Sequence, residues 1–329
     1  MIVQIYLQKE EGMLMSKDFI FIKLMDANQN EEFIIEEEEM VEKSYDKLIK
    51  RISVKWYYKN LIKRLPMKLG KLTFLGDSIP CAMLPFTKEE RLSLPSQYLD
   101  QYIKEIMKHL NINRAYCMEE LQEKDNESAE RERTLIKFLY LKQLVKISRD
   151  KLHIKEKDMK LVIIDSGDKR IEHVLELFIN NLNYLTIITN REEYFTGFRD
   201  MIYDTTGLVV EFEGLPLKNH IEGNVIIDLD SESYKSYNFF PYGACAIDVN
   251  SSAKKRQYLQ ERRKDLTIIY DVDLLYQGNI LKKNMMVNYL RAKSVNIEAI
   301  YGEYYRNINQ NEILELIETC KVKIIVIVI

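Results

Sequence analysis

The sequence has few of the residues that build most catalytic and metal sites. Its 329 residues include only four histidines, and no two cysteines or histidines stand at the spacing of a zinc site. So few histidines also argue against a Ser-His-Asp or Cys-His catalytic arrangement. The four cysteines are scattered without a C-x-x-C pair, which favours a reducing compartment, and we expect a cytoplasmic protein: Cys81, Cys117, Cys245 and Cys320.

Long apolar runs and a large net charge are missing as well. No apolar run reaches the roughly 18 residues of a membrane span, so no transmembrane helix is expected. The start, MIVQIYLQKEEGM, has acidic residues early and lacks the apolar region of a signal peptide. The net charge is -3, from 48 basic and 51 acidic residues, which gives no reason to expect DNA as a partner.

Glycine is scarce at the turn where a nucleotide-binding fold needs it. Residues 161–191, LVIIDSGDKRIEHVLELFINNLNYLTIITNR, read as strand, turn, helix and strand, the pattern of a βαβ unit. A dinucleotide fold places G-x-G-x-x-G at this turn, but the chain has D-S-G-D-K-R. If a cofactor binds here, its pyrophosphate would lie over Ser166, Gly167 and Asp168.

Two alternatives stay open for this turn. A carboxylate on Asp168 at the start of the helix would repel a phosphate, because it already complements the positive end of the helix dipole. The other interpretation is that Ser166 or Asp168 is simply a helix cap. At the end of the next strand, Asn190 and Arg191 stand where a dinucleotide meets the adenosine ribose. With an arginine and no acid there, NADP is favoured over NAD, although Asn190 could again be only a cap.

The second half of the chain repeats one theme, short apolar strands separated by helical segments. Strands rich in Ile and Val without alternation predict an α/β fold with a doubly wound, mainly parallel Rossmann-like sheet. The last run, VKIIVIVI, is expected to be a buried strand. We expect a smaller N-terminal α+β domain over 1–120, a charged linker and connecting helix over 121–150, and the Rossmann-like domain over 151–329.

Within the N-terminal domain, alternation over 18–25 followed by a polar turn predicts a hairpin that ends near Glu36. Short strands are expected at 71–75 and 82–86 around a Gly76-Asp77-Ser78 turn, and a helix from Pro95 to about Leu110.

Five segments of the second half, taken in order, resemble the NADP-binding domain of the shikimate dehydrogenase and glutamyl-tRNA reductase group. They are VIIDSG, LTIITNR, VIID, CAIDV and TIIYDVDLL, within about residues 160–277. The resemblance implies NADP as cofactor, with Asn190 and Arg191, Asp248, Asp271 and Asp273 in the family's positions. The chain departs from the group in its glycine-poor turn and in Asn250-Ser251, where the reductases carry proline–arginine.

The same resemblance implies a cysteine nucleophile in the N-terminal domain. Cys81, in GDSIPCAMLPF, is the candidate, although no neighbouring base is evident that would lower its pKa. The alternative is an ordinary buried cysteine.

Aspartates are expected to close several strands, at Asp165, Asp228 with Asp230, Asp248, and Asp271 with Asp273. Carboxylates gathered at the carboxyl edge of a parallel sheet could bind Mg²⁺. VIIDLDS also resembles the D-x-D motif of haloacid-dehalogenase-type phosphotransferases, which would make Asp228 the nucleophile and Asp230 the acid/base. Otherwise these residues only begin loops and cap helices.

Residues 47–71 hold nine basic residues and no acid around Trp56. Such an amphipathic helix can bind a membrane surface or RNA, or it is a surface helix balanced by the seven glutamates of 31–42. The sequence therefore predicts a divergent Rossmann-like protein with weakened or lost dinucleotide binding, which acts by binding a small molecule or a protein partner. Residual NADP-linked reduction, Mg²⁺-dependent phosphoryl transfer and an adaptor role are the alternatives.

Overall fold

The computed structural model describes residues 19–24, 41–43, 67–84, 94–110, 112–117, 126–293, 297 and 310–328. The chain divides into two compact units. Unit 1 comprises Met1–Asn126 and Asn284–Val295, and unit 2 comprises Glu127–Lys283 and Asn296–Ile329.

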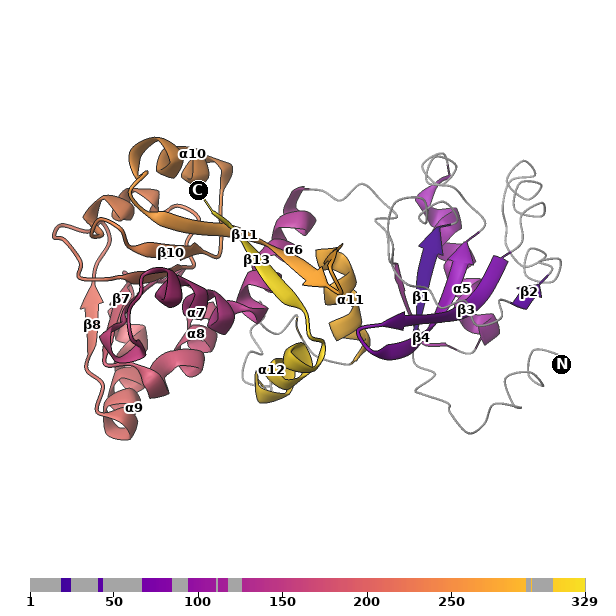
Figure 1. Ribbon diagram of the computed structural model, residues 1–329, viewed down its shortest axis with the longest axis horizontal. Coiled ribbons are helices and arrows are strands. Elements are labelled where there is room, and N and C mark those ends of the chain that lie inside the picture. Colours follow the sequence, from indigo (N-terminus) through magenta and orange to yellow (C-terminus); the bar gives the residue numbers. More distant parts are fainter. Residues whose placement is uncertain are drawn as a thin grey trace. The chain divides into compact units, whose positions relative to one another are not determined.

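Unit 2 is built on an eight-stranded sheet that contains a Rossmann-like core. Neighbouring strands follow the order β12-β11-β10-β9-β6-β7-β8. The last strand, β13, pairs with β11 (Figure 1). Every pairing from β8 to β11 is parallel. Numbered along the chain from β6, these six strands have the order 3-2-1-4-5-6 of a dinucleotide-binding fold. The strands are β6 Lys160–Ile164, β7 Tyr184–Ile188, β8 Val210–Glu213, β9 Val225–Asp228, β10 Cys245–Asp248, β11 Thr267–Tyr276, β12 Asn279–Leu281 and β13 Lys323–Val328.

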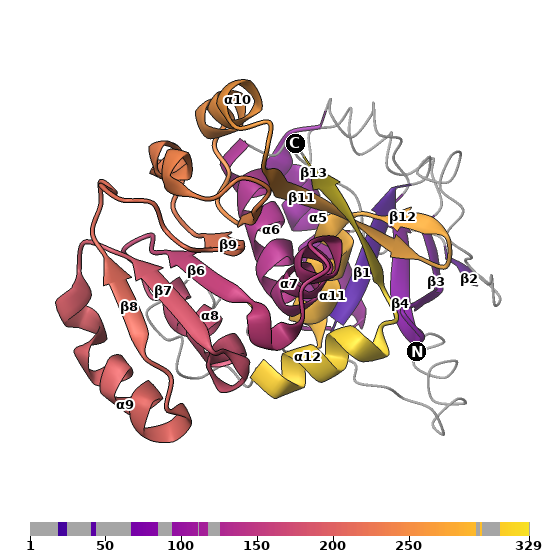
Figure 2. The same cartoon turned by 60° about the vertical axis from the view of Figure 1, so that its left-hand side comes forward.

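Helices and 3-10 turns connect these strands, as the alternating sequence pattern predicts. Apolar β-branched residues fill the central strands, and one face of the sheet packs against Leu259 of α10 and Tyr237 of η4. On the other face, α7 contacts β9 and β10. Figure 2 shows β8, β7, β6 and β9 side by side. The elements are α6 Asn126–Leu139, α7 Leu141–Lys151, α8 Arg170–Phe178, α9 Thr196–Thr206, α10 Ala253–Arg262, α12 Gln310–Thr319, η1 Glu156–Asp158, η2 Ile179–Asn181, η3 Glu192–Phe195 and η4 Ser233–Phe239.

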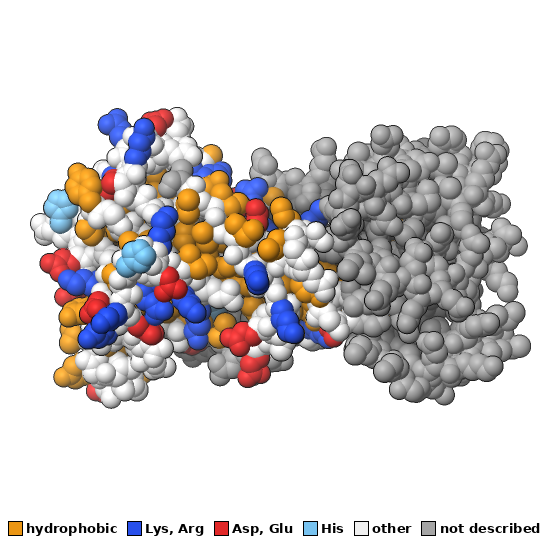
Figure 3. All heavy atoms as spheres, viewed as in Figure 1, with side chains coloured by type: hydrophobic (Ala, Val, Ile, Leu, Met, Phe, Trp, Pro, Cys, Tyr) orange, Lys and Arg blue, Asp and Glu red, His pale blue; other side chains and the backbone are white. Residues whose placement is uncertain are grey.

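The last strands differ from the sequence prediction in two respects. Asp271 and Asp273 lie inside β11 instead of at its end, because β11 continues to Tyr276 and pairs there with β12 and β13. The C-terminal run does form a strand, but β13 is not buried, since Ile325 and Val328 are about half exposed. Hydrophobic side chains accordingly reach the surface over β11 and β13 (Figure 3).

Unit 1 contains a five-stranded sheet of order β2-β3-β4-β1-β5. Its strands are β1 Phe19–Leu24, β2 Val41–Lys43, β3 Met67–Phe74, β4 Asp77–Leu84 and β5 Arg114–Cys117, with helices α5 Ser96–Leu110 and α11 Lys283–Ala292. The hairpin predicted from residue 18 onwards has its second arm outside the described residues. Instead, β1 pairs in parallel with β4 on one edge and β5 on the other.

A tight turn joins β3 to β4 at Leu75-Gly76, one residue earlier than the sequence predicts, because Asp77 and Ser78 already belong to β4. Leu75 and Gly76 both have positive φ, 53° and 90°, which a two-residue hairpin turn of this hand requires. Asp77 then accepts a hydrogen bond from the Tyr289 hydroxyl at 2.6 Å and forms an ion pair with Lys293, also at 2.6 Å. The segment around α11, distant in sequence, is thereby fixed to the N-terminal sheet.

Candidate functional site

In an open parallel sheet, ligands bind outside the carboxyl ends of the strands where the strand order reverses. Here the order reverses between β6 and β9, so the candidate site lies after Ile164 and after Asp228. Two groups of charged side chains occupy this edge. One surrounds Asp165, and the other surrounds Lys255.

Asp165 follows β6 directly and is buried. Its carboxylate accepts hydrogen bonds from the backbone N–H of Gly167 at 2.9 Å and from the Thr189 hydroxyl at 2.7 Å. Gly167 has a φ of +83°, in the left-handed region that favours glycine. The one glycine of this turn therefore shapes the loop around a carboxylate of the chain itself.

Arg191, at the end of β7, completes this first group. Its guanidinium binds Asp165 in a bidentate manner, with Nε at 2.7 Å from Oδ2 and Nη2 at 2.8 Å from Oδ1. Nη2 also donates to the backbone carbonyl of Asp168, and the guanidinium carbon lies 4.2 Å from the centroid of the Tyr194 ring. Paired and stacked in this way, Arg191 is directed at the turn and held there.

Asp168 occupies the start of α8. Its Oδ1 accepts the backbone N–H of Arg170 at 2.8 Å, and its Oδ2 binds the Arg170 Nε at 2.7 Å. Burial pushes the pKa of Asp168 upward, but the hydrogen bonds and charge of Arg170 outweigh burial and hold that pKa below its usual range. Asp168 thus lies one residue before Lys169, the N-cap residue of α8, and its carboxylate binds the first backbone N–H of the helix.

These contacts use the donors that a dinucleotide would need. A pyrophosphate binds to backbone N–H groups of the turn and the helix N-terminus. Here the N–H of Gly167 donates to Asp165, and that of Arg170 donates to Asp168. Asn190 is exposed and accepts the backbone N–H of Leu215 at 2.7 Å. The residues that the sequence predicts for a cofactor are therefore gathered at one edge, and the turn there holds the carboxylates of Asp165 and Asp168.

The second group lies at the ends of β9 and β10, where Asp228 and Asp248 are register neighbours. Lys255, from α10, places its ammonium between them, 2.6 Å from Asp228 Oδ2 and 2.7 Å from Asp248 Oδ1. The exposure of all three side chains is 0%. The Ser233 hydroxyl adds a hydrogen bond of 2.6 Å to Asp228. The cluster is therefore a buried ion triad.

Electrostatics distinguish the two buried lysines at this edge. Burial lowers the pKa of Lys255, but the attraction of Asp228 and Asp248 outweighs burial and raises that pKa above its ordinary value. Burial raises the pKa of Asp228, as does the charge of Asp248. Lys137 of α6 donates instead to the backbone carbonyls of Asp248 and Tyr270, at 2.8 and 2.9 Å. With burial as the main cause, the pKa of Lys137 falls to about 8.

The ion triad already uses one of the two aspartates that the Mg²⁺ alternative requires. Asp228 is fully buried and ion-paired, whereas the side chain of Asp230 accepts the backbone N–H of Glu232 at 3.1 Å. Within the part of the chain that the structure describes, no group of three or more Asp, Glu, His or Cys side chains is arranged to bind a metal ion. The D-x-D pair of the sequence therefore begins a loop and stabilises it.

The remaining sequence candidates lie elsewhere. Cys81 is a half-buried residue of β4 in unit 1. The basic segment 47–71 lies outside the described residues as far as 66, and Met67–Phe74 is strand β3. No helix among the described residues is long and apolar enough to cross a membrane.

Sequence reasoning missed both buried lysines. Lys137 interrupts the apolar helical run LIKFLYL, and this interruption was a usable signal for a buried cation. Lys255 stands in AKKRQY beside other basic residues, where nothing distinguishes it from a surface lysine.

No protein-family model matches this sequence, and no curated protein is significantly similar to it. Among solved structures, the chain is similar to L-tryptophan dehydrogenase from Nostoc punctiforme, with a TM-score of 0.33, 9% identity, and 92% of this chain and 78% of that one covered. A shikimate 5-dehydrogenase-like protein has a TM-score of 0.27 and 12% identity over 58% and 62% of the two chains. A ligand-free 5-ketofructose reductase from Gluconobacter has a TM-score of 0.28 and 9% identity over 85% and 100%. The Rossmann-like assignment rests on the strand order of the sheet.

Proposed function

We propose that this chain is a divergent Rossmann-like binding protein whose dinucleotide site is filled by its own side chains. The observation that carries the proposal is the pair of Asp165 and Arg191, at 2.7 and 2.8 Å, inside the turn after β6. A phosphate entering this turn would meet two carboxylates and would have to displace Asp165 from Arg191. The protein then acts by binding a ligand or a protein partner, and the scattered cysteines favour the cytoplasm.

The buried triad supports the same proposal on the other side of the switch point. In a dinucleotide fold, the second half of the cofactor extends over the ends of the fourth and fifth strands. Here those ends carry Asp228, Asp248 and Lys255, all buried and mutually paired. Lys137 fills the neighbouring position by binding the carbonyls of Asp248 and Tyr270.

A second candidate function is residual NADP-linked reduction. It is favoured by the position of Arg191, whose side chain keeps 27% of its surface exposed at the strand end where an arginine accepts the extra phosphate of NADP. Under this alternative, NADP binding would break the ion pair with Asp165.

Thermal unfolding of the intact chain in millimolar NADPH, in NADH and in buffer distinguishes the binding protein from the NADP-linked reductase. A ligand at about 100 times its Kd would add roughly 2.7 kcal/mol, a shift of several degrees in Tm for a unit of this size. The proposal predicts no shift with either nucleotide. A shift with NADPH alone that disappears in Arg191→Ala would overturn the proposal and favour the NADP-linked alternative.

A further inference from the structure

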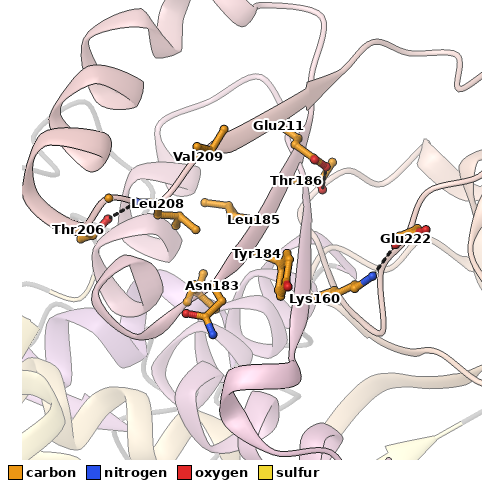
Figure 4. Close-up of a pocket in the computed structure, with 12 residues that line it drawn as sticks. Lys160, Asn183, Tyr184, Leu185, Thr186, Thr206, Leu208, Val209, Glu211 and Glu222 are labelled. Atoms are coloured by element: carbon orange, nitrogen blue, oxygen red, sulfur yellow. Dashed lines mark hydrogen bonds and ion pairs between the residues drawn. The ribbon is translucent and has the colours of Figure 1, made fainter.

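One hollow formed by the described residues lies at the amino edge of the unit 2 sheet, opposite to the candidate site at the carboxyl edge. It has a volume of about 430 Å³ and lies over the amino ends of β6, β7 and β8. Lys160 and Tyr184 are the first residues of β6 and β7, and Val209 immediately precedes β8 (Figure 4). Tyr184 and Val209 are 53% and 67% exposed, so the hollow is open to solvent.

Strand register explains why these side chains share one face. Lys160 pairs with Tyr184, and Thr186, two residues along β7, pairs with Glu211 of β8. Because side chains on a strand alternate between faces, Tyr184 and Thr186 point the same way, and their cross-strand partners join them. The Thr186 hydroxyl donates to Glu211 at 3.3 Å. Thr186 is itself buried, so the part of the hollow that is open to solvent lies at the strand starts, around Tyr184 and Val209.

The charges in the hollow favour a cation. Its lining includes two carboxylates, Glu211 and Glu222, and one ammonium, Lys160. Lys160 forms an ion pair with Glu222 and lies 5.5 Å from the centroid of the Tyr184 ring. These contacts, chiefly the hydrogen bond with Glu222, raise the pKa of Lys160. Glu211 forms no ion pair within the lining, although its charge also contributes to raising the pKa of Lys160. The lining therefore holds one more carboxylate than ammonium.

From this arrangement we infer that the hollow binds a lysine side chain of a partner polypeptide. Tyr184 provides a ring face for the ammonium and Glu211 a carboxylate, while the exposed Val209 can contact the aliphatic stem. The chain's own Lys160 already makes both kinds of contact, since its ammonium pairs with Glu222 and lies over the Tyr184 ring. The open mouth suits a side chain that stays attached to a larger body. The inference rests on the proposed function as a binding protein and names the chemistry of its partner.

Amide NMR spectra of the intact protein test this inference directly. The probe is a short alanine peptide with one central lysine, and its control has norleucine at that position, which keeps the stem and removes the charge. Saturable shifts confined to amides near Tyr184, Val209 and Glu211 are expected with the lysine peptide only. Shifts at other acidic surfaces, equal shifts with norleucine, or no shifts overturn the inference.

Three variants are expected to change the affinity for the lysine peptide in opposite directions. Glu211→Gln and Tyr184→Leu should each weaken binding by roughly two- to fivefold, the range of an exposed ion pair or cation–π contact. Lys160→Met should tighten it by a similar factor, because it releases Glu222 and the ring. Glu318→Gln, an exposed residue of α12 outside the hollow, is the matched control and should change nothing. If Lys160→Met weakens binding as Glu211→Gln does, the inference is overturned. NADPH binding and lysine binding are measured separately, so failure of the proposed function would be visible on its own.

Discussion

Replacing Lys255 with methionine probes the buried triad at the carboxyl edge of β9 and β10. The substitution keeps the length of the stem and removes the ammonium that lies 2.6 Å from Asp228 and 2.7 Å from Asp248. Two carboxylates then remain side by side at positions with no solvent exposure. Breaking a buried ion pair from one side costs about 3–5 kcal/mol. For a unit of this size, that loss corresponds to roughly a 10 °C decrease in Tm.

The assay is urea unfolding followed by far-UV circular dichroism, at pH 5 and at pH 8. The loss should be larger at pH 8. Burial already raises the pKa of Asp228. Without Lys255 this carboxyl takes up a proton at low pH, and the folded state is destabilised as rising pH removes that proton. Lys254→Met is the matched control, since Lys254 is the exposed neighbour on the same helix and its loss should change stability by less than about 0.5 kcal/mol. Equal stability of the two variants at pH 8 would refute the reasoning.

Three further predictions concern buried groups of unit 2, each checked by unfolding free energies. Burial lowers the pKa of Lys137 from 10.5 to about 8. Between pH 8 and 10.5 the unfolded chain therefore binds more protons than the folded one, and the free energy of unfolding should rise with pH. Lys137→Met should lack this rise. Burial lowers the pKa of His173 from 6.5 to about 4. The free energy of unfolding should therefore fall by roughly 3 kcal/mol as the pH decreases from 6.5 to 4. The loss of this pH dependence in His173→Gln would confirm that His173 causes it. A Cβ on Gly223 would lie 2.3 Å from Val162 Cγ2, so Gly223→Ala should lose about 1–3 kcal/mol, and adding Val162→Ala should recover part of that loss.

The parallel core could be predicted from the sequence because its signal is local. Runs such as LVII, LTII and VIID are apolar on both sides of each strand, and this is the pattern of strands covered by helices on both faces. The structure confirms a mainly parallel sheet, with β6, α8 and β7 built from residues 160–188. The acidic turn was also visible, since D-S-G-D-K-R stands between an apolar strand run and a helical segment.

Long-range pairings were beyond such reasoning. Nothing local indicates that Arg191 reaches back 26 residues to Asp165, or that Lys255 lies between two strand ends. The exposure of β13 was missed for a similar reason. Its composition is that of a buried strand, but its burial depends on which elements cover β11 and β13, and a pattern of single residues does not contain that information.

The most direct test of the central claim is to remove the two carboxylates and ask whether the turn then binds a nucleotide. Asp165→Asn keeps the shape of the side chain, and Asp168→Ser keeps a capping oxygen for the N–H of Arg170. The double variant Asp150→Asn/Asp200→Asn changes the net charge equally at exposed positions and serves as the control. Isothermal titration with NADPH should show binding by the Asp165→Asn/Asp168→Ser protein and none by the intact chain or the control. NADPH binding of equal strength by the intact chain would contradict the account, because the carboxylates would then not be filling the site.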